Sequence, residues 1–509
     1  MDILQESLID PISAFLWNYV LVYLLIGAGI YFTIRTRFVQ FRLFGRMLTL
    51  ITESRTGAEG GISSFQAFSV GLASRVGTGN IAGVAIALTL GGPGAVFWMW
   101  MVALLGMATA FVESALAQVY KIPWEDKSFR GGPAYYIQRG LGSRTWGSIF
   151  ALLLIFAFGI AFNMVQANTI SDVINDRVTE GWVALILMVL VAPVLFGGIR
   201  RVATVAEKIF PPAAAIYVLM AVVVIALNIT EIPGVIADIV GAAFGLGEAA
   251  AGIAGGIAAA MLNGVKRGLF SNEAGMGSAP NAAATATTTH PAKQGLIQSL
   301  GVFVDTILVC SATAFIILLA GPSVYDPGTT TDAQGASLTQ AALTEHFGSW
   351  SAWVLAVIVT VLAFSSILGN YSYSEGNLEF LGIGNRGLTV FRFLVLLSVG
   401  IGSMLALEPV WALADVGMGL MAVVNLVAIL LLFPMALGVL KDFEAQWGVR
   451  HDADFAPQGN EFLPKAVESD AWPPPWHQGE ESVPAGGSDP AGGSDPVGGS
   501  GESPGTTQT

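Results

Sequence analysis

The sequence predicts an all-helical protein that crosses a membrane about eleven times. Of its 509 residues, 54% are hydrophobic and only 12% are charged, and the mean hydropathy is +0.67. Soluble domains carry about 25% charged residues, so we exclude a soluble globular protein. A membrane-spanning helix needs roughly 20 predominantly apolar residues. Such segments lie near residues 13–34, 64–90, 93–120, 148–170, 181–199, 204–228, 249–275 (continuing towards 288), 294–320, 350–374, 390–407 and 411–439.

Basic residues cluster in two of the predicted loops. The loop after the first span holds Arg35, Arg37, Arg42, Arg46 and Arg55, and the loop after the third holds Lys121, Lys127, Arg130, Arg139 and Arg144. Lys and Arg are retained on the cytoplasmic side of a cell membrane. We therefore expect an extracellular N-terminus (residues 1–12), a transmembrane domain over residues 13–440 of a multi-pass plasma-membrane protein, and a cytoplasmic C-terminus.

The composition changes abruptly after Leu440. Residues 441–509 are rich in Pro, Gly, Ser and acidic side chains, and they carry most of the net charge of −13. Such a segment buries too little apolar surface to offset the entropy lost on ordering it. We expect a disordered acidic cytoplasmic tail over residues 441–509, and the acidity argues against nucleic acid as a partner.

The second predicted span is interrupted at residues 73–83 by three glycines, three uncharged polar side chains and an arginine. Freed backbone groups are costly in the bilayer core unless protein, water or an ion satisfies them. One interpretation is close helix packing, for which Gly79 and Gly83 form a small-xxx-small pair; the other is an interruption that lines a binding site. A dinucleotide loop is excluded because no βαβ context surrounds these glycines.

A second interruption, residues 264–280, falls in the seventh predicted span, five spans after the first. Spans that are five apart run in opposite directions, and paired breaks of this kind indicate a transporter built from inverted repeats. We expect repeats near residues 64–228 and 249–439, with the first span as an addition. A half-helix N-terminus attracts a carboxylate and unwound carbonyls suit Na⁺, so an α-amino acid and Na⁺ match both features.

Four long motifs combine small, polar and aromatic residues at these breaks and near them. They are residues 76–84 (VGTGNIAGV), 91–106 (GGPGAVFWMWMVALLG), 266–280 (KRGLFSNEAGMGSAP) and 415–425 (DVGMGLMAVVN). They resemble the motifs of the alanine or glycine:cation symporter family, in the amino acid-polyamine-organocation superfamily. The resemblance covers about residues 10–440. It implies a leucine-transporter-like fold in which inward Na⁺ flux drives uptake of a small neutral amino acid such as alanine or glycine.

The resemblance also implies the site residues. One sodium ion would lie between the first and eighth core helices, on Ala73, Val76, Leu362, Ser365 and Ser366. The substrate would contact both interruptions and two further helices, through Thr78, Gly79, Asn80, Gln166, Phe270, Ser271, Asn272, Ala274, Gly275 and Asn370. As alternatives, the serines bond back within their own helix, and Gln166 serves interhelical packing.

Arg75 and Asn370 depart from the pattern of the family, in which a small residue and Trp are common at these positions. Asn370 in place of Trp would enlarge and polarise the pocket, so we expect glutamine as a possible further substrate. Intramembrane charges mark function or a buried partner. Besides Arg75 they are Glu113, Lys266, Arg267, Glu273, Asp305 and Glu375. For Glu273 we expect an ion pair with Lys266 or Arg267, with gating or proton coupling as the functional alternative.

Other functions fit the sequence less well. The spans contain no HExxH or GxSxG motif and no cluster of catalytic His or Cys residues, and the single cysteine, Cys310, cannot form an internal disulfide. We expect no enzyme and no cofactor, with Na⁺ as the coupling ion. The repeated charge rings of an ion channel are missing. A proton-coupled amino-acid transporter of the same fold remains the main alternative.

Overall fold

The computed structural model is almost entirely helical and describes residues 5–54, 61–124, 128–174, 179–197, 199–246, 253–327, 334–447 and 453–472. In this part of the chain, eight helices are long and apolar enough to cross a membrane. They are Gln5–Arg35, Gly94–Val119, Arg144–Ile174, Lys208–Leu227, Pro291–Leu318, Trp350–Phe380, Asn385–Gly402 and Leu407–Gln446. The predicted all-helical, multi-spanning architecture is confirmed.

The second, fifth and seventh predicted spans are not among these eight. In the second, α6 (Ser64–Arg75) is separated from η3 (Gly79–Gly83) and α7 (Val84–Gly91). The fifth corresponds to α12 (Glu180–Leu195), which has 16 residues. In the seventh, α15 (Ile253–Asn272) is separated from α16 (Ala279–Thr285). Both predicted interruptions are therefore real breaks in helices, and the total of eleven spans stays a prediction.

The other labelled elements are the segments that make up the eight long helices and the short elements that connect them. In chain order they are η1 (Gln5–Ile9), α2 (Asp10–Phe15), η2 (Leu16–Leu21), α3 (Val22–Arg35), α4 (Val39–Arg42), α5 (Phe44–Glu53), β1 (Ile62–Ser63), α8 (Gly94–Val119), β2 (Ile122–Pro123), β3 (Phe129–Arg130), α9 (Pro133–Leu141), α10 (Arg144–Phe156), η5 (Ala157–Ala161), α11 (Phe162–Ile174), α13 (Ile199–Leu227), α14 (Ile232–Ala243), β4 (Ala286–Thr287), α17 (Pro291–Val302), η6 (Phe303–Cys310), α18 (Ser311–Leu318), α19 (Ala336–Phe347), α20 (Trp350–Phe380), α21 (Asn385–Gly402) and α22 (Leu407–Gln446).

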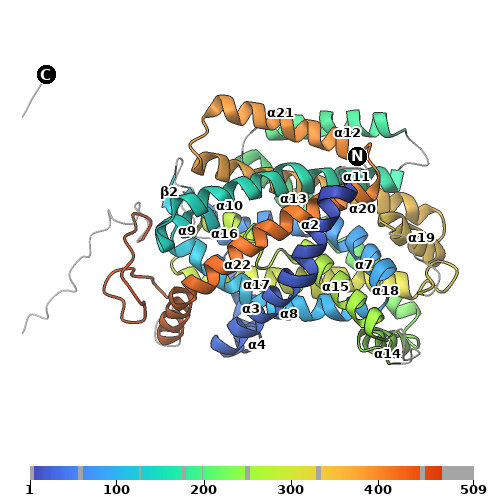
Figure 1. Cartoon of the computed structure of the whole chain (residues 1–509), viewed down its shortest axis with the longest axis horizontal. Coiled ribbons are helices and arrows are strands. Elements are labelled where there is room, and N and C mark those ends of the chain that lie inside the picture. Colours follow the sequence, from blue (N-terminus) through green and yellow to red (C-terminus); the bar gives the residue numbers. More distant parts are fainter. Residues whose placement is uncertain are drawn as a thin grey trace, which may run out of the picture.

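The two broken helices lie side by side and run in opposite directions. β1 precedes α6, β4 follows α16, and the two strands pair in parallel, Ile62 with Ala286 and Ser63 with Thr287. At the other end, the Asn263 Nδ2 of α15 donates to the carbonyl oxygen of Leu90 in α7 (3.3 Å). Figure 1 shows α7 and α15 as neighbours, with α8 and α17 packed beside them. The start of the first broken helix is thus fixed to the end of the second.

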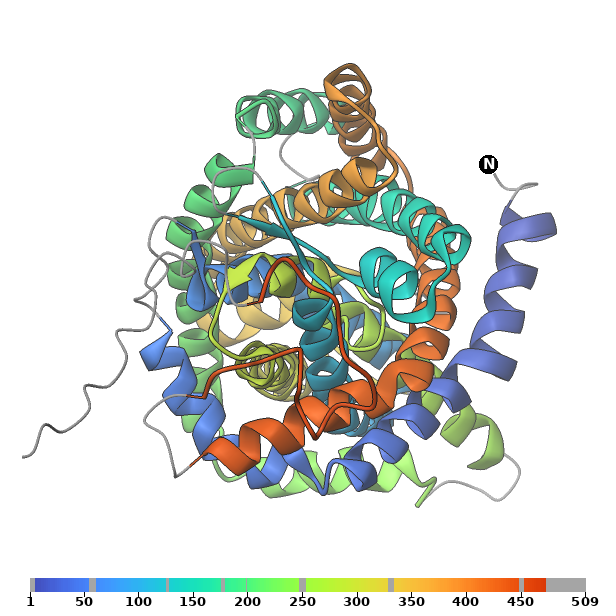
Figure 2. The same ribbon diagram turned by 90° about the vertical axis from the view of Figure 1, so that its left-hand side faces the viewer.

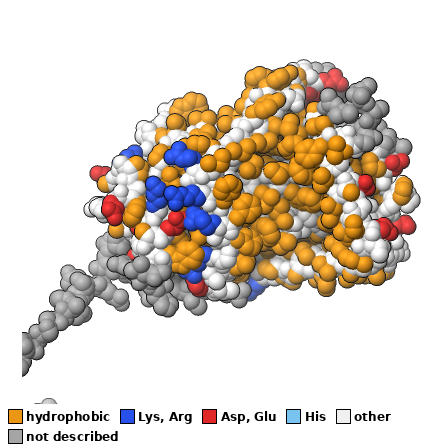
Figure 3. All heavy atoms as spheres, turned by 90° about the horizontal axis from the view of Figure 1, so that it is seen from below, with side chains coloured by type: hydrophobic (Ala, Val, Ile, Leu, Met, Phe, Trp, Pro, Cys, Tyr) orange, Lys and Arg blue, Asp and Glu red, His pale blue; other side chains and the backbone are white. Residues whose placement is uncertain are grey.

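The predicted basic loops gather at one end of the molecule, together with the end of α22. Arg42 forms an ion pair with Glu444 (2.6 Å), and Arg139 donates to the carbonyl oxygen of Lys121 (3.3 Å). We call this the basic end. Figure 3 shows a broad apolar surface beside a group of Lys and Arg side chains, as expected of a protein with a lipid-facing belt.

The prediction of a disordered tail from residue 441 is wrong for two segments. α22 continues to Gln446, and residues 453–472 pack against the basic end, where Val467, Ala471 and Trp472 are buried. Figure 2 shows this segment lying across the end of the helix bundle. Apolar side chains among the Pro and Gly residues supply the packing that composition alone does not reveal. The rest of the predicted tail, including residues 473–509, lies outside the described residues.

His290 links this segment to α22. Burial lowers the pKa of His290, which favours the neutral ring. Its Nδ1 accepts a hydrogen bond from the backbone N–H of Ala292 (3.1 Å), so the proton on Nε2 faces the carboxylate of Asp442 (3.2 Å). The ring also packs against Phe455, with centroids 5.5 Å apart.

Candidate functional site

At the first break, other helices approach the glycine backbone closely. α6 begins with a capping box between Ser63 and Gln66 and ends at Arg75, after which Val76 is extended (φ −76°, ψ 97°). A Cβ at Gly79 would lie 2.9 Å from the Phe270 ring and 3.1 Å from Cα of Ser271. A Cβ at Gly77 would collide with the hydroxyl of Ser366. Only glycine allows the backbone of this break to meet α15 and α20 so closely.

Four of the five predicted sodium-binding residues, all except Val76, come together on one side of this break. The carbonyl oxygen of Ala73 accepts hydrogen bonds from Ser366 (3.1 Å) and Ser365 (3.4 Å). The same hydroxyls donate to the carbonyl oxygen of Leu362, at 3.1 and 2.7 Å. Since each hydroxyl has one proton, it serves one of these carbonyls at a time. The serines therefore bond back within α20 and also reach across to α6, and buried Val76 lies three residues beyond Ala73.

Gln166 of α11 reaches the other side of the same break. Its Oε1 accepts hydrogen bonds from the Thr78 hydroxyl (2.5 Å) and the Thr78 backbone N–H (3.3 Å). The backbone N–H of Gly77 donates to Oδ1 of Asn80 (2.9 Å). Freed N–H groups at a break need acceptors, and amide oxygens supply them here. Gln166 thus bonds at the first break itself, where a substrate carboxylate was expected.

Asn80 joins the two breaks through a buried carboxylate. Its Nδ2 donates to Oδ1 of Asp305 (2.8 Å) and to the Ser271 hydroxyl (2.9 Å). Oδ2 of Asp305 accepts hydrogen bonds from the hydroxyls of Ser271 (2.6 Å) and Thr306 (2.8 Å). Asp305 is fully buried. This carboxylate therefore organises the contact between η3, α15 and η6.

The second break depends on unusual backbone conformations. Glu273, Gly275 and Gly277 have φ values of 59°, 90° and 84°, a region that favours glycine and strains other residues. The Glu273 carboxylate accepts hydrogen bonds from Ser278 (2.5 Å) and Ser74 (3.2 Å).

The expected ion pair of Glu273 with Lys266 or Arg267 is wrong. Both cations instead contact Oδ2 of Asp415 in α22, at 2.9 and 2.7 Å. Asp415 lies far along the sequence on another helix, whereas the prediction considered neighbours within the motif.

Three predicted substrate residues, Asn272, Ala274 and Gly275, lie in the turn of the second break and have other hydrogen-bond partners than Asn80. The Asn272 side chain accepts from the backbone N–H of Ala274 (3.0 Å), and the backbone N–H of Gly275 donates to Glu113 of α8 (3.2 Å). The Asn425 Nδ2 of α22 donates both to the carbonyl oxygen of Gly275 and to Glu113, each at 2.9 Å. Ala274 and Gly275 are thus held between α8 and α22, and not at the first break.

Stacked aromatic rings cover the break on the side away from the basic end. Phe270 stacks on Phe162 with ring centroids 4.4 Å apart, and its ring lies 4.6 Å from that of Trp411. The guanidinium of Arg267 lies 4.6 Å above the Trp411 ring. The Arg267–Asp415 ion pair and these rings close the site in this direction.

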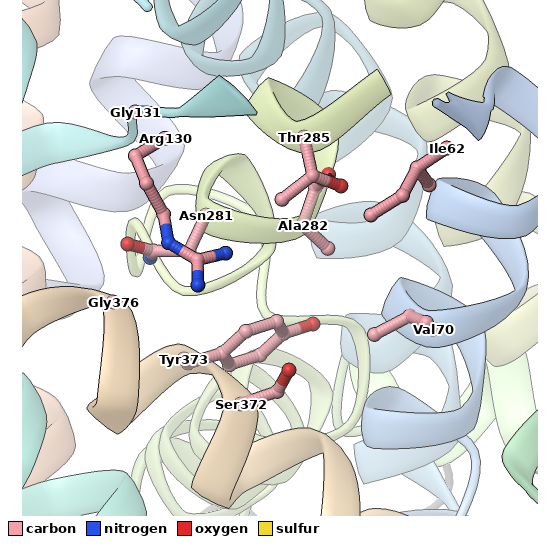
Figure 4. Close-up of a pocket in the computed structure, with 10 residues that line it drawn as sticks. All are labelled: Ile62, Val70, Arg130, Gly131, Asn281, Ala282, Thr285, Ser372, Tyr373 and Gly376. Carbon is pink, nitrogen blue, oxygen red and sulfur yellow. Dashed lines mark hydrogen bonds between the residues drawn. The ribbon is translucent and has the colours of Figure 1, made fainter. Parts of the chain in front are cut away.

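On the side of the basic end, a narrow pocket lies between the broken helices and α20. It is lined by residues from β1, α6, β3, α16 and α20, among them Val70, Arg130, Asn281 and Tyr373. Figure 4 shows the Tyr373 ring and the Arg130 guanidinium extending into the space between these elements. Arg130 is paired with Glu379 (2.6 Å). Tyr373 lies one turn after Asn370, so the pocket approaches the break from this end.

Asn370 itself connects α20 to two other helices. Its Nδ2 donates to Oδ1 of Asn163 (3.0 Å). Its Oδ1 lies 3.0 Å from the Ser74 hydroxyl, whose single proton serves either this oxygen or the Glu273 carboxylate. The residue therefore presents a polar, hydrogen-bonded amide beside the first break.

Comparison with known proteins shows the family of the chain. Residues 1–456 match the sequence profile of the sodium:alanine symporter family. The chain belongs to that family. It is 50% identical to the amino-acid carrier protein AlsT of Bacillus subtilis (88% of this chain, 94% of AlsT). It is 46% identical to the probable sodium/glutamine symporter GlnT of the same organism (88% and 92%), and 38% identical to the sodium/alanine symporter AgcS of Methanococcus maripaludis (86% and 97%).

This member of the sodium:alanine symporter family is thus a cation-coupled amino-acid symporter of the membrane and not an enzyme. The resemblance recognised in the motifs is confirmed. Asp305 was noted in the sequence only as an intramembrane charge, and no role at the site was expected for it. A lone acid in an apolar span was the available signal, whereas its partners Asn80 and Ser271 became visible only in the fold.

Proposed function

We propose that the protein couples inward Na⁺ movement to the uptake of a small neutral amino acid, alanine or glycine and also glutamine, by alternating access. The convergence of four oxygens beside a hydrogen-bonded substrate position supports this most directly. These oxygens belong to Ala73, Leu362, Ser365 and Ser366. The antiparallel broken helices support the further proposal of a leucine-transporter-like arrangement of two inverted repeats, with the basic end towards the cytoplasm.

In this proposal Na⁺ binds to the carbonyl oxygens of Ala73, Val76 and Leu362 and to the hydroxyls of Ser365 and Ser366. All are neutral oxygen donors, which suit Na⁺ at an unwound helix. The ion would replace the hydroxyl protons as the partner of both carbonyl oxygens, and it would also bind free lone pairs of both hydroxyls. It would therefore draw α6 and α20 together. Within the described residues there is no cluster of His, Cys, Asp and Glu arranged to bind a metal, and the proposed ligand set does not need one.

The substrate carboxylate would replace Gln166 as the acceptor for Thr78. Both donors of Thr78 already point at one oxygen, that of Gln166. Gly79, Asn80, Phe270, Ser271 and Asn272 would form the rest of the site, and Asn370 its polar edge. We do not include Ala274 and Gly275 as direct contacts, because Glu113 and Asn425 hold that turn against α8 and α22.

Coupling would arise because both ligands act on one short turn. A side chain at Gly77 would meet Ser366 on the sodium side and Gln166, at 3.2 Å, on the substrate side. Na⁺ binding would therefore fix the turn that carries the Thr78 donors. Each ligand then raises the affinity for the other by the same factor, as linkage requires, and together they shift the population towards an occluded state.

Uptake by proteoliposomes tests this function. We expect labelled alanine and glycine to accumulate under an inward Na⁺ gradient and not under an H⁺ gradient of equal size. Accumulation driven only by H⁺ would support the proton-coupled alternative. Equal uptake without any ion gradient would refute symport.

The glutamine proposal has its own test. Asn370 and Asn163 form an amide pair beside the break, and a glutamine side chain carries the matching donor and acceptor. We expect unlabelled glutamine to compete with labelled alanine. If alanine and glycine are transported while glutamine neither moves nor competes, this part of the proposal is wrong.

A further inference from the structure

Arg75 is a buried guanidinium that hydrogen bonds satisfy only in part. It is 2% exposed, and its Nη1 donates to the carbonyl oxygen of Gln298 (3.3 Å). Its Nε and Nη2 have no hydrogen-bond partner among the described residues. Gly301 makes room for it, since a Cβ there would lie 2.6 Å from Nη1. Packing and one hydrogen bond, rather than an ion pair, hold this charge in place.

Three buried carboxyl groups, those of Glu113, Glu273 and Asp305, lie in the same region as Arg75. Ser74, the residue before Arg75, donates to Glu273 (3.2 Å), and Gly301, which lies against the Arg75 guanidinium, comes one turn before Asp305. Glu113 bonds to Gly275, two residues after Glu273. Each accepts hydrogen bonds from neighbouring groups: Glu113 from Gly275 and Asn425, Glu273 from Ser74 and Ser278, and Asp305 from Asn80, Ser271 and Thr306. The centre of the protein therefore carries more acidic than basic side chains around the breaks.

We propose that Arg75 is a fixed cation that limits the Na⁺ bound in each transport cycle to one ion. This inference rests on the proposed Na⁺ symport. Uncompensated charge in a low-dielectric interior is costly and attracts counter-ions. Arg75 supplies one positive charge that cannot dissociate. Without it, the carboxyl groups keep one more uncompensated negative charge, and Na⁺ is the cation available to neutralise it.

The test compares the Na⁺ dependence of uptake in Arg75→Gln and Arg75→Lys. We expect Arg75→Gln to make the dependence of uptake on Na⁺ concentration steeper, with a Hill coefficient rising from about 1 towards 2. Arg75→Lys keeps the charge and should keep the wild-type Hill coefficient. The double variant Arg75→Gln/Glu273→Gln removes one charge of each sign and should restore the wild-type steepness. Na⁺-dependent thermal stabilisation of the purified protein gives a second readout that does not depend on transport.

Arg392→Gln is the control, because this arginine is paired with Glu375 (3.1 Å) and lies outside the proposed site; the Na⁺ dependence of its uptake should be as steep as in the wild type. The proposal is overturned if Arg75→Gln keeps the wild-type steepness in both assays, or if Arg75→Lys is as steep as Arg75→Gln. If Arg75→Gln fails to insert, Arg75→Met, which also removes the charge and keeps a long side chain, should show the same steeper Na⁺ dependence, and wild-type steepness in it would overturn the proposal. A wild-type protein that shows no Na⁺ dependence would instead overturn the proposed symport itself.

A second inference concerns residues 453–472, which we call the C-terminal strap. The backbone N–H of Phe455 donates to the carbonyl oxygen of Thr289 (2.9 Å), and the Thr289 hydroxyl donates to Ala453 (2.8 Å). Trp472 donates from Nε1 to the carbonyl oxygen of Gln118 (2.9 Å). The strap thus spans the connection from α16 to α17 and the end of α8.

Lys121 adds contacts among the strap, α8 of the first proposed repeat and β4 of the second. Its Nζ donates to Gln118 (2.7 Å) and to the carbonyl oxygen of Ala286 in β4 (2.9 Å), and it lies 4.5 Å from the centre of the Trp472 ring. The family match ends at residue 456, so most of the strap lies beyond it.

We infer that the strap is a latch that holds the basic end closed and slows its opening. Opening that end moves α16 relative to α8 in the proposed alternating access, and this motion has to break the Phe455 and Trp472 contacts. Stabilising a closed state lowers the rate of the opening step. Removing the strap should therefore raise the rate without changing which amino acids are transported.

Nested truncations test the latch. A chain ending at residue 472 should keep the wild-type initial rate, while one ending at residue 452 should transport about threefold faster. A cysteine at Thr285, which lines the pocket of Figure 4, should react faster with a thiol reagent in the shorter chain. Trp472→Ala gives a milder variant should the truncated chain fail to fold. Equal rates and equal labelling in the two truncated chains, or a joint fall in rate and thermal stability, would overturn the latch.

Discussion

The two breaks use glycine for different reasons. At the first break, Gly77 and Gly79 allow side chains of α20 and α15 to approach the backbone, while Val76 stays in ordinary extended geometry. At the second, Gly275 and Gly277 have positive φ values, and Glu273 adopts one as well. The shape of the first break depends on the side chains that pack against it, whereas the shape of the second depends on its own backbone conformation. This difference supports the proposal that the first break binds ligands and the second supports it structurally.

The partners of the two breaks differ in charge as well. On the sodium side of the first break, carbonyl and hydroxyl oxygens meet around Ala73. At the second break, the carboxyl groups of Glu113 and Glu273 bind the turn. A weakly held ion must be able to leave during a transport cycle, which neutral ligands permit, whereas a permanent turn gains from charged hydrogen bonds. The contrast supports the proposal that ion exchange takes place at the first break.

The largest fall in uptake is expected from a substitution at Asn80, where the two breaks are in contact. Asn80→Ala removes an acceptor from Gly77 and donors to Asp305 and Ser271. Each buried group left unpaired costs about 1–3 kcal/mol, so saturable uptake should fall roughly 100-fold or more. Uptake kinetics and a membrane-insertion assay check this. Asn228→Ala is the control, because among the described residues that amide bonds only to the carbonyl of Val224 in its own helix. Wild-type uptake in Asn80→Ala would remove Asn80 from the site.

A change at the second break should act on stability. Gly277→Ala puts a side chain on a residue with φ +84°, and its Cβ would lie 2.8 Å from both Asn425 and Pro133. Strain of this kind costs about 1–3 kcal/mol, so the thermal denaturation temperature should fall. Gly27→Ala, whose Cβ would meet nothing within 4 Å, should leave it unchanged. A lowered Na⁺ affinity with normal stability in Gly277→Ala would contradict the assignment of this break to support.

A smaller effect is expected at the first break, on affinity rather than stability. Gly77→Ala forces the Ser366 hydroxyl away from Ala73 while the backbone φ remains allowed. We expect about a tenfold rise in the Na⁺ concentration for half-maximal uptake, equivalent to about 1.4 kcal/mol, with little change in thermal stability. Na⁺ titrations of uptake and of thermal stabilisation measure this. Equal losses of stability in Gly77→Ala and Gly277→Ala would remove the distinction between the two breaks.

The smallest change in Na⁺ affinity is expected from the removal of a single hydroxyl, that of Ser366. Ser366→Ala deletes one proposed Na⁺ ligand and leaves Ser365 in place, so the Na⁺ concentration for half-maximal uptake should rise about fivefold, or ~1 kcal/mol. Ser366→Thr keeps the hydroxyl and serves as the control. An unchanged Na⁺ dependence in Ser366→Ala would support the alternative in which this serine only bonds back within α20.

The sequence predicted the breaks well because their residues are chemically unusual within a membrane span. Gly77, Thr78 and Asn80 stand out against an apolar background, and the motifs also led to Gln166 and Ser366. The pairing of Asp305 with Asn80 was missed, since a contact between residues so far apart in sequence is decided by the packing of whole helices. Asp415 as the partner of Lys266 and Arg267 was missed for the same reason.

The C-terminal strap shows a different limit of sequence interpretation. Its Pro, Gly and acidic residues predict disorder by composition, yet Phe455, Val467 and Trp472 bury their side chains against the helices. A few widely spaced apolar residues suffice when a folded surface already exists to receive them. Average composition describes the segment in isolation and omits that surface.

The short parallel pair of β1 and β4 has a consequence for how the protein is made. It joins residues roughly 220 positions apart in the chain, yet it anchors the start of the first broken helix. That anchor forms only after the seventh predicted span has been synthesised and inserted. The first repeat therefore reaches the membrane before its own starting point is secured, and its assembly is completed by the second.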